Sequence, residues 1–162
     1  MKKLIVVIFL SLILSGCTTY RPQYDADYEK AVSAVIDKSS ETIKFNDHAI
    51  WHPNRSTIPT VFPIPTPIEG NMVITDKTLY FLEWDSDSNA YNIVKKLPIT
   101  DIQNVKITTF GLNRQLAIQS KNNNFDLFSY TSHIKRNGDM NIEVLNYINS
   151  LIKKSPVVPE RH

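Results

Sequence analysis

Residues 70–131 alternate short apolar runs with turn-forming residues, and this pattern constrains the possible fold more than any other feature of the chain. Short runs rich in Val, Ile, Phe and Tyr, bounded by Asp, Asn, Ser and Gly, are typical of antiparallel strands. Within the last predicted hairpin, around 121–124, apolar and polar residues alternate with a period of two. The predicted strands are 71–75, 78–84, 91–97, 102–109, 115–120 and 125–130.

Helical patterns flank this β-rich region on both sides. Between 25 and 38, apolar residues recur three and four positions apart, and acidic residues at the start favour the helix dipole. A second helix is predicted at 139–154, with Asp139 or Asn141 as its N-cap and 155–162 as a tail beyond it. Its apolar stripe consists of Val144, Leu145, Ile148, Leu151 and Ile152.

A proline-rich segment, 53–68, separates the first helix from the β-rich region. Proline cannot donate a hydrogen bond to a sheet ladder, so this segment is expected to be extended, at a sheet edge or wrapped over the domain. Phe62 and Ile64 lie within it and favour packing against the domain; docking into an aromatic groove is the alternative. Residues 39–51 remain ambiguous, because only 42–45 alternate like a strand.

Residues 1–16 carry a separate signal. A pair of lysines precedes an apolar run at 4–14, and the small residues Ser15 and Gly16 follow it. A positive start, a short apolar run and small residues are the parts of a secretory signal peptide. The apolar run is too short to cross a bilayer as a stable helix. We therefore expect residues 1–16 to be removed from the mature protein.

Leu14-Ser15-Gly16-Cys17 resembles the lipobox of bacterial lipoproteins. The resemblance implies a diacylglyceryl group on the Cys17 thiol, cleavage before this residue, and acylation of the new amine, with palmitate as a typical chain. Two or three acyl chains anchor a protein stably, whereas one does so only marginally. Residues 17–24 then form a lipidated tether that spans roughly 25 Å when extended. By the same resemblance Thr18 favours an outer-membrane anchor facing the periplasm, while the host's envelope type stays open.

The single cysteine and the charge balance exclude several classes of protein. Cys17 is the only cysteine, so no disulfide stabilises the domain, and an apolar core must do so. Loss of 1–16 leaves 18 − 2 = 16 basic against 16 acidic residues, a mature net charge of zero. A neutral, well-mixed chain argues against nucleic-acid binding and against a polybasic surface for anionic lipids. Residues 25–154 are expected to form a single domain.

Two segments resemble GRAM and pleckstrin-homology-like (PH-like) domains. Residues 70–82, Gly-Asn-Met-Val-Ile-Thr-Asp-Lys-Thr-Leu-Tyr-Phe-Leu, resemble their opening hairpin, and 96–105, Lys-Leu-Pro-Ile-Thr-Asp-Ile-Gln-Asn-Val, resemble the next segment. The resemblance implies an α+β fold, in which a curled antiparallel sheet forms a partial barrel capped by the C-terminal helix. It also places the first strand in the proline-rich 60–68 stretch. The basic loop that holds phosphoinositides in some members is replaced by the acidic 85–89, so lipid-headgroup binding is not expected.

The remaining polar residues form no recognisable catalytic or metal site. His48 and His52 have the spacing of a helical metal pair, but no third ligand is nearby, so structural or surface roles are favoured. His133 has no recognisable carboxylate partner. Residues 85–89 lack the glycine and distal glutamate of a calcium loop and are interpreted as a hairpin loop. We therefore expect no catalytic residue, no metal, no cofactor and no enzymatic activity.

The function predicted from the sequence is a membrane-anchored, non-enzymatic binding or scaffolding module. It would hold an envelope protein or peptide through a sheet edge or beside the C-terminal helix. Candidate contacts are Phe62, Ile64, Trp84 and Tyr91, although core packing is the commoner role of strand aromatics. The alternative is a carrier of an apolar ligand or lipid, which predicts a cavity inside the half-barrel. The partner and the oligomeric state stay open.

Overall fold

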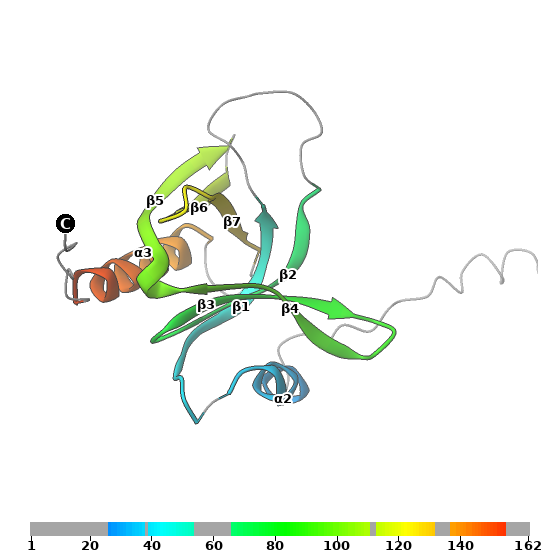
Figure 1. Cartoon of the computed structure of the whole chain (residues 1–162). Coiled ribbons are helices and arrows are strands. Elements are labelled where there is room, and N and C mark those ends of the chain that lie inside the picture. Colours follow the sequence, from blue (N-terminus) through cyan, green and yellow to red (C-terminus); the bar gives the residue numbers. More distant parts are fainter. Residues whose placement is uncertain (1–25, 38, 54–65, 111–112, 132–136, 155–162) are drawn as a thin grey trace, which may run out of the picture.

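The computed structural model describes residues 26–37, 39–53, 66–110, 113–131 and 137–154 (Figure 1). The expected signal peptide, Cys17, the tether and the tail lie outside these residues, as do Phe62 and Ile64. Within the described ranges, no helix is both long and apolar enough to span a membrane.

The described chain forms a single antiparallel sheet with one helix before it and one after it. Its elements are α2 (Ala26–Val35), β1 (Ile43–His52), β2 (Ile68–Thr75), β3 (Thr78–Asp85), β4 (Ala90–Pro98), the 3-10 helix η1 (Ile99–Asp101), β5 (Ile102–Phe110), β6 (Asn113–Ser120), β7 (Phe125–Tyr130) and α3 (Asn137–Lys154). The sheet has 7 strands in the order β4-β3-β2-β1-β7-β6-β5. Consequently β4 and β5, which are consecutive in the chain and joined by η1, are the two edge strands.

Strand β1 is shared between the two halves of the sheet. It pairs with β2 from Ile43 to Trp51, and residues 49–52 also pair with β7. Figure 1 shows β5, β6 and β7 turned across β3 and β4, so that the sheet curls around an interior. Such coiling follows from the right-handed twist of strands. A curled antiparallel sheet with an N-terminal and a C-terminal helix confirms the predicted α+β arrangement.

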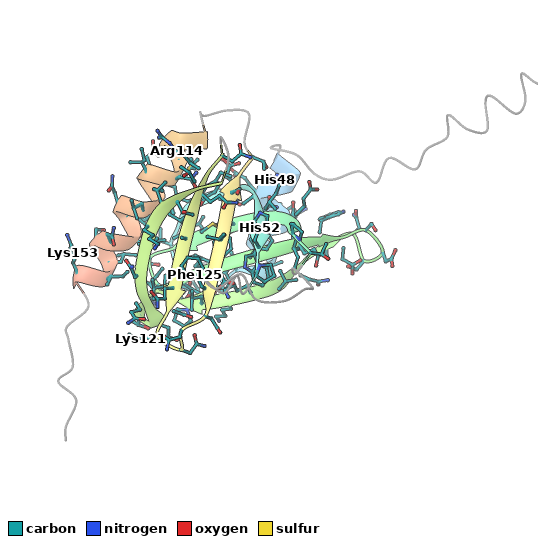
Figure 2. All side chains as sticks on the ribbon, turned by 90° about the horizontal axis from the view of Figure 1, so that it is seen from above. His48, His52, Arg114, Lys121, Phe125 and Lys153 are labelled. Atoms are coloured by element: carbon teal, nitrogen blue, oxygen red, sulfur yellow. The ribbon has the colours of Figure 1, made fainter. Side chains whose placement is uncertain are left out.

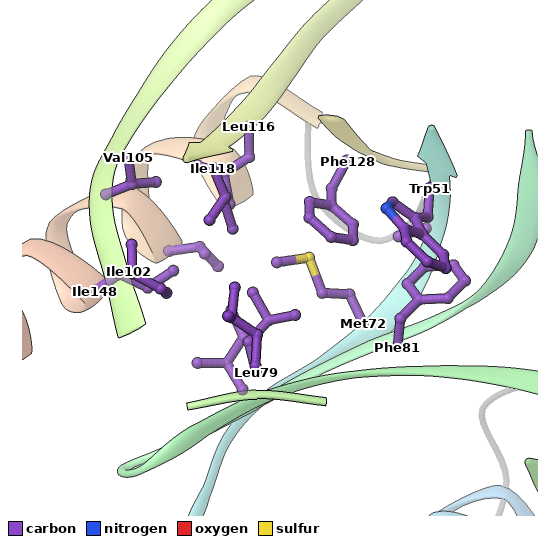
Figure 3. Packing of buried hydrophobic residues seen from close by; sticks show 14 of the residues in the cluster. Trp51, Met72, Leu79, Phe81, Ile102, Val105, Leu116, Ile118, Phe128 and Ile148 are labelled. Atoms are coloured by element: carbon purple, nitrogen blue, oxygen red, sulfur yellow. The ribbon is translucent and has the colours of Figure 1, made fainter. Parts of the chain in front are cut away.

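The concave side of the sheet holds the main core. Alternate residues point inward, such as Met72 on β2 and Leu79 and Phe81 on β3, all fully buried. Aromatic rings gather at one side of this core, where the Trp51 ring centroid lies 5.6 Å from that of Phe81 and 6.3 Å from that of Phe128 (Figure 3). This packed set supplies the apolar burial that a domain without disulfides needs.

Helix α3 closes one end of this interior and runs alongside β5. Val144 and Ile148 on its buried face are fully inaccessible and belong to the main core. The amide Nδ2 of Asn141 donates to the carbonyl oxygen of Arg114 at 3.0 Å, and the helix also contacts η1. Arg114 pairs with Thr109 at the end of β5, whereas η1 precedes its start. The helix therefore runs antiparallel to β5.

The N-caps predicted for α3 were wrong, since Asp139 and Asn141 both lie inside a helix that begins at Asn137.

Helix α2 covers the outer face of β2, β3 and β4. Val32 and Ile36, part of the predicted stripe, are buried there in a second apolar cluster. Their partners on the sheet include Val73, Tyr80 and Leu82. Because the main core lies on the other face, β2 and β3 are covered on both sides. This explains why nearly all of their residues are buried instead of every second one.

The location of the first strand is the main correction to the sequence-based expectation. The strand that pairs with β2 ahead of it in the chain is β1, which begins within the ambiguous region, whereas residues 60–65 of the proline-rich stretch lie outside the described residues. The strand was difficult to recognise because Asp47 occupies an inward position, 4% exposed, where an apolar residue is expected. On the same face Phe45 precedes Asp47, and Ala49 and Trp51 follow it.

The hairpin predicted around 121–124 is confirmed by the pairing of β6 with β7. Its register places Leu116 opposite Phe128 and Ile118 opposite Asp126, and all four side chains are buried. Leu116, Ile118 and Phe128 belong to the main core, so Leu127 lies on the opposite, outer face.

Candidate functional site

A sheet that does not close leaves two strands with unpaired backbone groups along one side. Here these strands are β4 and β5. Edge strands can accept an extended segment of another protein, and natural sheets often carry features that prevent this. The two edges of this sheet differ in those features.

Strand β4 carries several features that obstruct strand addition. Its register with β3 shifts between the partners of Phe81 and Leu82, which leaves Val94 as the extra residue of a bulge. Pro98 has no backbone N–H, and Lys95 points into the interior. The exposed apolar residues of this edge, Ile93 at 42% and Val94 at 37%, therefore lie on an irregular strand.

Lys95 belongs to a polar cluster that ties β4 to β1 and β7 across the interior. Its Nζ lies 2.5 Å from Oδ2 of Asp126 and 5.1 Å from the centroid of the Trp51 ring. The indole Nε1 of Trp51 donates to Oδ1 of Asp126 at 3.0 Å. The side chains of Lys95 and Asp126 are 18% and 2% exposed, so loss of either would leave a largely buried charge without its partner. The cluster therefore fixes β4 in place.

Strand β5 presents a more regular edge. It pairs only with β6 among the described strands, and its register is continuous from 104 to 110. Only two residues separate the partners Phe110 and Asn113, which is typical of a hydrogen-bonded pair at the end of a tight hairpin. In an antiparallel pair of strands, hydrogen-bonded and non-hydrogen-bonded residue pairs alternate. Counting back from Phe110, every second residue of β5 therefore has its backbone N–H and C=O turned away from β6. The N–H and C=O groups that face the free edge are those of Val105, Ile107 and Thr109.

One flank of α3 extends this edge with apolar surface. At about 100° per residue, the helix places Tyr147 on one side of the buried Ile148 and Ile142 and Leu145 on the other. The Tyr147 ring packs edge-on against Phe45 of β1, with centroids 5.4 Å apart. The opposite flank faces away from Phe45, and α3 also contacts β5 and β6. On that flank Ile142 is 41% exposed, and Leu145 is half-buried against the core.

Positive side chains surround the β5 edge. Lys106, in the middle of β5, is exposed and has its Nζ 5.9 Å from the Phe125 ring centroid. Figure 2 shows Lys153 near one end of α3 and Arg114 near the other, with Lys121 at the end of the sheet. All four cations are exposed, and residues 102–125 contain no Asp or Glu. The edge is thus locally basic, although the mature chain is expected to have no net charge.

The predicted partner contacts Trp84 and Tyr91 lie beneath α2. Their ring centroids are 4.9 Å apart with an interplanar angle of 71°, and both pack in the cluster with Val32. Tyr91 is only 6% exposed, so its use by a partner would require α2 to move. The core-packing interpretation is confirmed for both rings, and their role as partner contacts stays a prediction.

His48 and His52 both lie on strand β1, where the helical spacing of a metal pair does not apply. Four residues along a strand separate the Cα atoms by about 13 Å. Nδ1 of His48 instead contacts the hydroxyl of Thr131. Across the described ranges, no group of three His, Cys, Asp or Glu side chains could hold a metal ion. His133 lies outside these ranges.

Residues 86–89 form the turn between β3 and β4, within the hairpin loop predicted at 85–89. Oδ1 of Asp85 accepts the backbone N–H of Asp87 at 2.9 Å, and its Oδ2 accepts the Ser88 hydroxyl at 2.8 Å. These bonds, the one from Ser88 most strongly, lower the pKa of the Asp85 carboxyl. Asn89 has a φ of 52°, which asparagine tolerates in turns. The Asp85 carboxylate thus stabilises the turn.

A second polar cluster joins the start of β1 to the β2–β3 turn. The carboxylate of Glu41 accepts hydrogen bonds from the hydroxyls of Thr75 at 2.5 Å, Thr78 at 3.2 Å and Tyr80 at 3.0 Å. Burial, and then the bond to Glu41, raises the pKa of Tyr80. Because these hydroxyls are all bonded to Glu41, the cluster has a structural role.

No protein-family model matches the sequence, and no curated protein matches it. Among solved structures, an inhibited form of Vav1 superposes with a TM-score of 0.52 at 11% identity, over 82% of this chain and 34% of that one. A fragment of p115-RhoGEF with its DH and PH domains gives 0.50 at 9% identity, over 85% and 36%. The fold is PH-like. At such identities the likeness concerns the fold alone, and the PH-like chain spans about a third of those two structures.

The β5 edge was not singled out by sequence reasoning. The available signal was the absence of acidic residues from 102–125, a stretch that carries Lys106, Arg114 and Lys121. Such a local bias is hidden when charge is summed over the chain. Its meaning also depends on knowing that β5 is an edge strand, which only the topology shows.

Proposed function

We propose that this chain is a membrane-anchored, non-enzymatic binding module that holds an extended segment of a protein partner along β5, beside α3. The observation that carries the proposal is the regular, unpaired edge of β5 next to the apolar flank of α3. An added strand would pair with the free backbone groups of Val105, Ile107 and Thr109. The lipobox-like sequence at Cys17 supports an acyl anchor in the cell envelope, on the outer membrane and facing the periplasm.

The proposal selects β5 over β4 on physical grounds. The bulge at Val94, the inward Lys95 and Pro98 all weaken β4 as a template for another strand. From 104 to 110, β5 has none of these features. In this account the curled sheet is a partial barrel, and the partner binds where it remains open, between its two edge strands.

The alternative function, transport of an apolar ligand, needs room inside the curled sheet. The rings of Trp51, Phe81 and Phe128 occupy that position, with centroids 5.6 to 6.3 Å apart. Figure 3 shows the side chain of Met72 beside these rings, extending from them toward Leu79 and Ile118. The packed interior supports the binding module over the carrier.

Photo-crosslinking in cells tests the proposal. A photoreactive amino acid is placed at Thr109 on the β5 edge or at Ile142 on α3, and at Asp87 in the exposed β3–β4 turn as the control. We expect the same protein adduct from Thr109 and Ile142, and none from Asp87. A specific adduct from Val94 on β4, with none from the β5 positions, would overturn the proposed site.

A proline substitution separates backbone pairing from general contact. Thr109→Pro removes one N–H that faces the free edge, while the ladder with β6 keeps its hydrogen bonds. We expect this variant to melt close to the wild type and to lose most of the adduct from position 142. An unchanged adduct would show that the partner does not bind by strand addition.

A further inference from the structure

We infer that the segment bound at the β5 edge is acidic as well as apolar, with apolar residues alternating with Asp or Glu. This inference rests on the proposed function and adds the chemistry of the partner. It follows from the side chains on the two faces of β5 and from the charges around that strand.

The inner face of the edge selects apolar residues. Side chains of an added strand alternate between faces, and those paired with Val105 and Ile107 would lie on the same face as these residues. Val105 is buried, and Ile107 is half-buried against the main core. On this side the added strand also meets the flank of α3 that carries Ile142 and Leu145. Every second residue of the bound segment is therefore apolar.

On the outer face of β5, charge decides which residues of the bound segment can stand between its apolar residues. The outer side chains of β5 are those of Asn104, Lys106 and Thr108, and only Lys106 is charged. Opposite charges on directly paired residues stabilise a sheet, whereas like charges destabilise it. A Glu or Asp beside Lys106 fits this position, and a Lys or Arg does not.

The charges at the ends of the edge act in the same direction. Lys121 and Lys153 are exposed near one end of the β5–α3 surface, and Arg114 is exposed near the other (Figure 2). The same elements also carry the carboxylates of Asp101, in η1 just before β5, and of the exposed Glu143 on α3, and the four cations outnumber these two. An acidic segment is attracted along the whole edge, while a basic one is repelled.

Binding of designed peptides to the lipidated full-length protein, followed by fluorescence anisotropy, tests this inference. Each peptide has the 9 residues of β5, and valine alternates with glutamate, serine or lysine. We expect the glutamate peptide to bind about threefold to tenfold more tightly than the serine peptide, and the lysine peptide to bind most weakly. High salt should remove most of this difference, because exposed charges are screened.

Charge reversal provides matched variants. Lys106→Glu should weaken binding of the glutamate peptide and strengthen that of the lysine peptide, whereas Lys30→Glu on exposed α2 should change neither. If all three peptides bind equally and Thr109→Pro abolishes binding, the acidic preference is wrong and strand addition stands. If no peptide binds at all, both the inference and the proposed use of β5 are overturned.

Discussion

At the residue scale, the buried polar side chains are what the sequence pattern predicted least well. The strand aromatics were expected mainly as packing residues, and Phe81, Trp84 and Tyr91 lie in the two apolar clusters. In contrast, Asp47 and Asp126 occupy buried positions that the apolar pattern does not anticipate. Asp126 is accommodated because a lysine and an indole from other strands bond to it. Such partners come from distant parts of the chain, so periodicity cannot reveal them.

Tyr130 provides a prediction at this scale. Its side chain is 1% exposed, and its hydroxyl has no hydrogen-bond partner among the described residues. Burial, with a smaller contribution from Asp47, raises the pKa of this hydroxyl. Folding therefore favours the protonated phenol, and that stability is lost as the pH rises above the ordinary tyrosine pKa of about 10. Tyr130→Phe removes this source of alkaline sensitivity.

Urea unfolding at several pH values tests the role of Tyr130. Near pH 7 we expect Tyr130→Phe to be as stable as the wild type or more stable, because an unsatisfied hydroxyl is removed. Above about pH 10 its advantage should grow by about 1.4 kcal/mol per pH unit. Parallel stability curves for the two proteins would contradict this account.

At the element scale, local sequence patterns identified most of the strands but not which strands pair with one another in the sheet. The ranges predicted for β2 to β7 each coincide with an observed strand, because each one carries a clear apolar run. The region of β1 stayed ambiguous, with strand-like alternation recognised only at 42–45, since Asp47 interrupts the inward face. The proline-rich segment was chosen in its place on the basis of the family resemblance. Edge position depends on the pairing of all the strands, so the β5 edge could not be recognised from one segment alone.

The docking of α2 can be tested with two carboxylates on the same helix. Val32→Asp places a charge in the cluster beneath α2, whereas Ala34→Asp places it on the exposed face. We expect Val32→Asp to release α2, with a red shift in Trp84 emission and faster hydrogen exchange at 26–36, while the main core stays folded. Ala34→Asp should resemble the wild type. Identical behaviour of the two variants would show that α2 does not depend on this cluster.

At the scale of the whole molecule, the fold was largely predictable and the site was not. The two segments with a family resemblance, 70–82 and 96–105, fall on the β2–β3 hairpin and on the passage from β4 to β5. They therefore define the order of elements that a PH-like fold requires. The proposed binding surface instead combines β5 with a helix that begins 27 residues after β5 ends. Its basic character is apparent only after these elements are brought together.

Membrane anchoring is the prediction that concerns the complete chain. If Cys17 carries the lipid, Cys17→Ser abolishes acylation, and the protein leaves the membrane fraction for the soluble one. The sheet should be unaffected, because residue 17 lies outside the domain expected at 25–154. Membrane fractionation with metabolic palmitate labelling provides the readout. Unchanged membrane association of Cys17→Ser, without label in the wild type, would contradict acylation at this residue.

Hydrogen exchange on the full-length protein in membranes, with and without its crosslinked partner, tests the central claim most directly. The account predicts slower exchange within 102–110, at the edge amides of Val105, Ile107 and Thr109, with 90–98 unchanged. Slower exchange at 90–98 or in the 85–89 turn, with 102–110 unchanged, would contradict it.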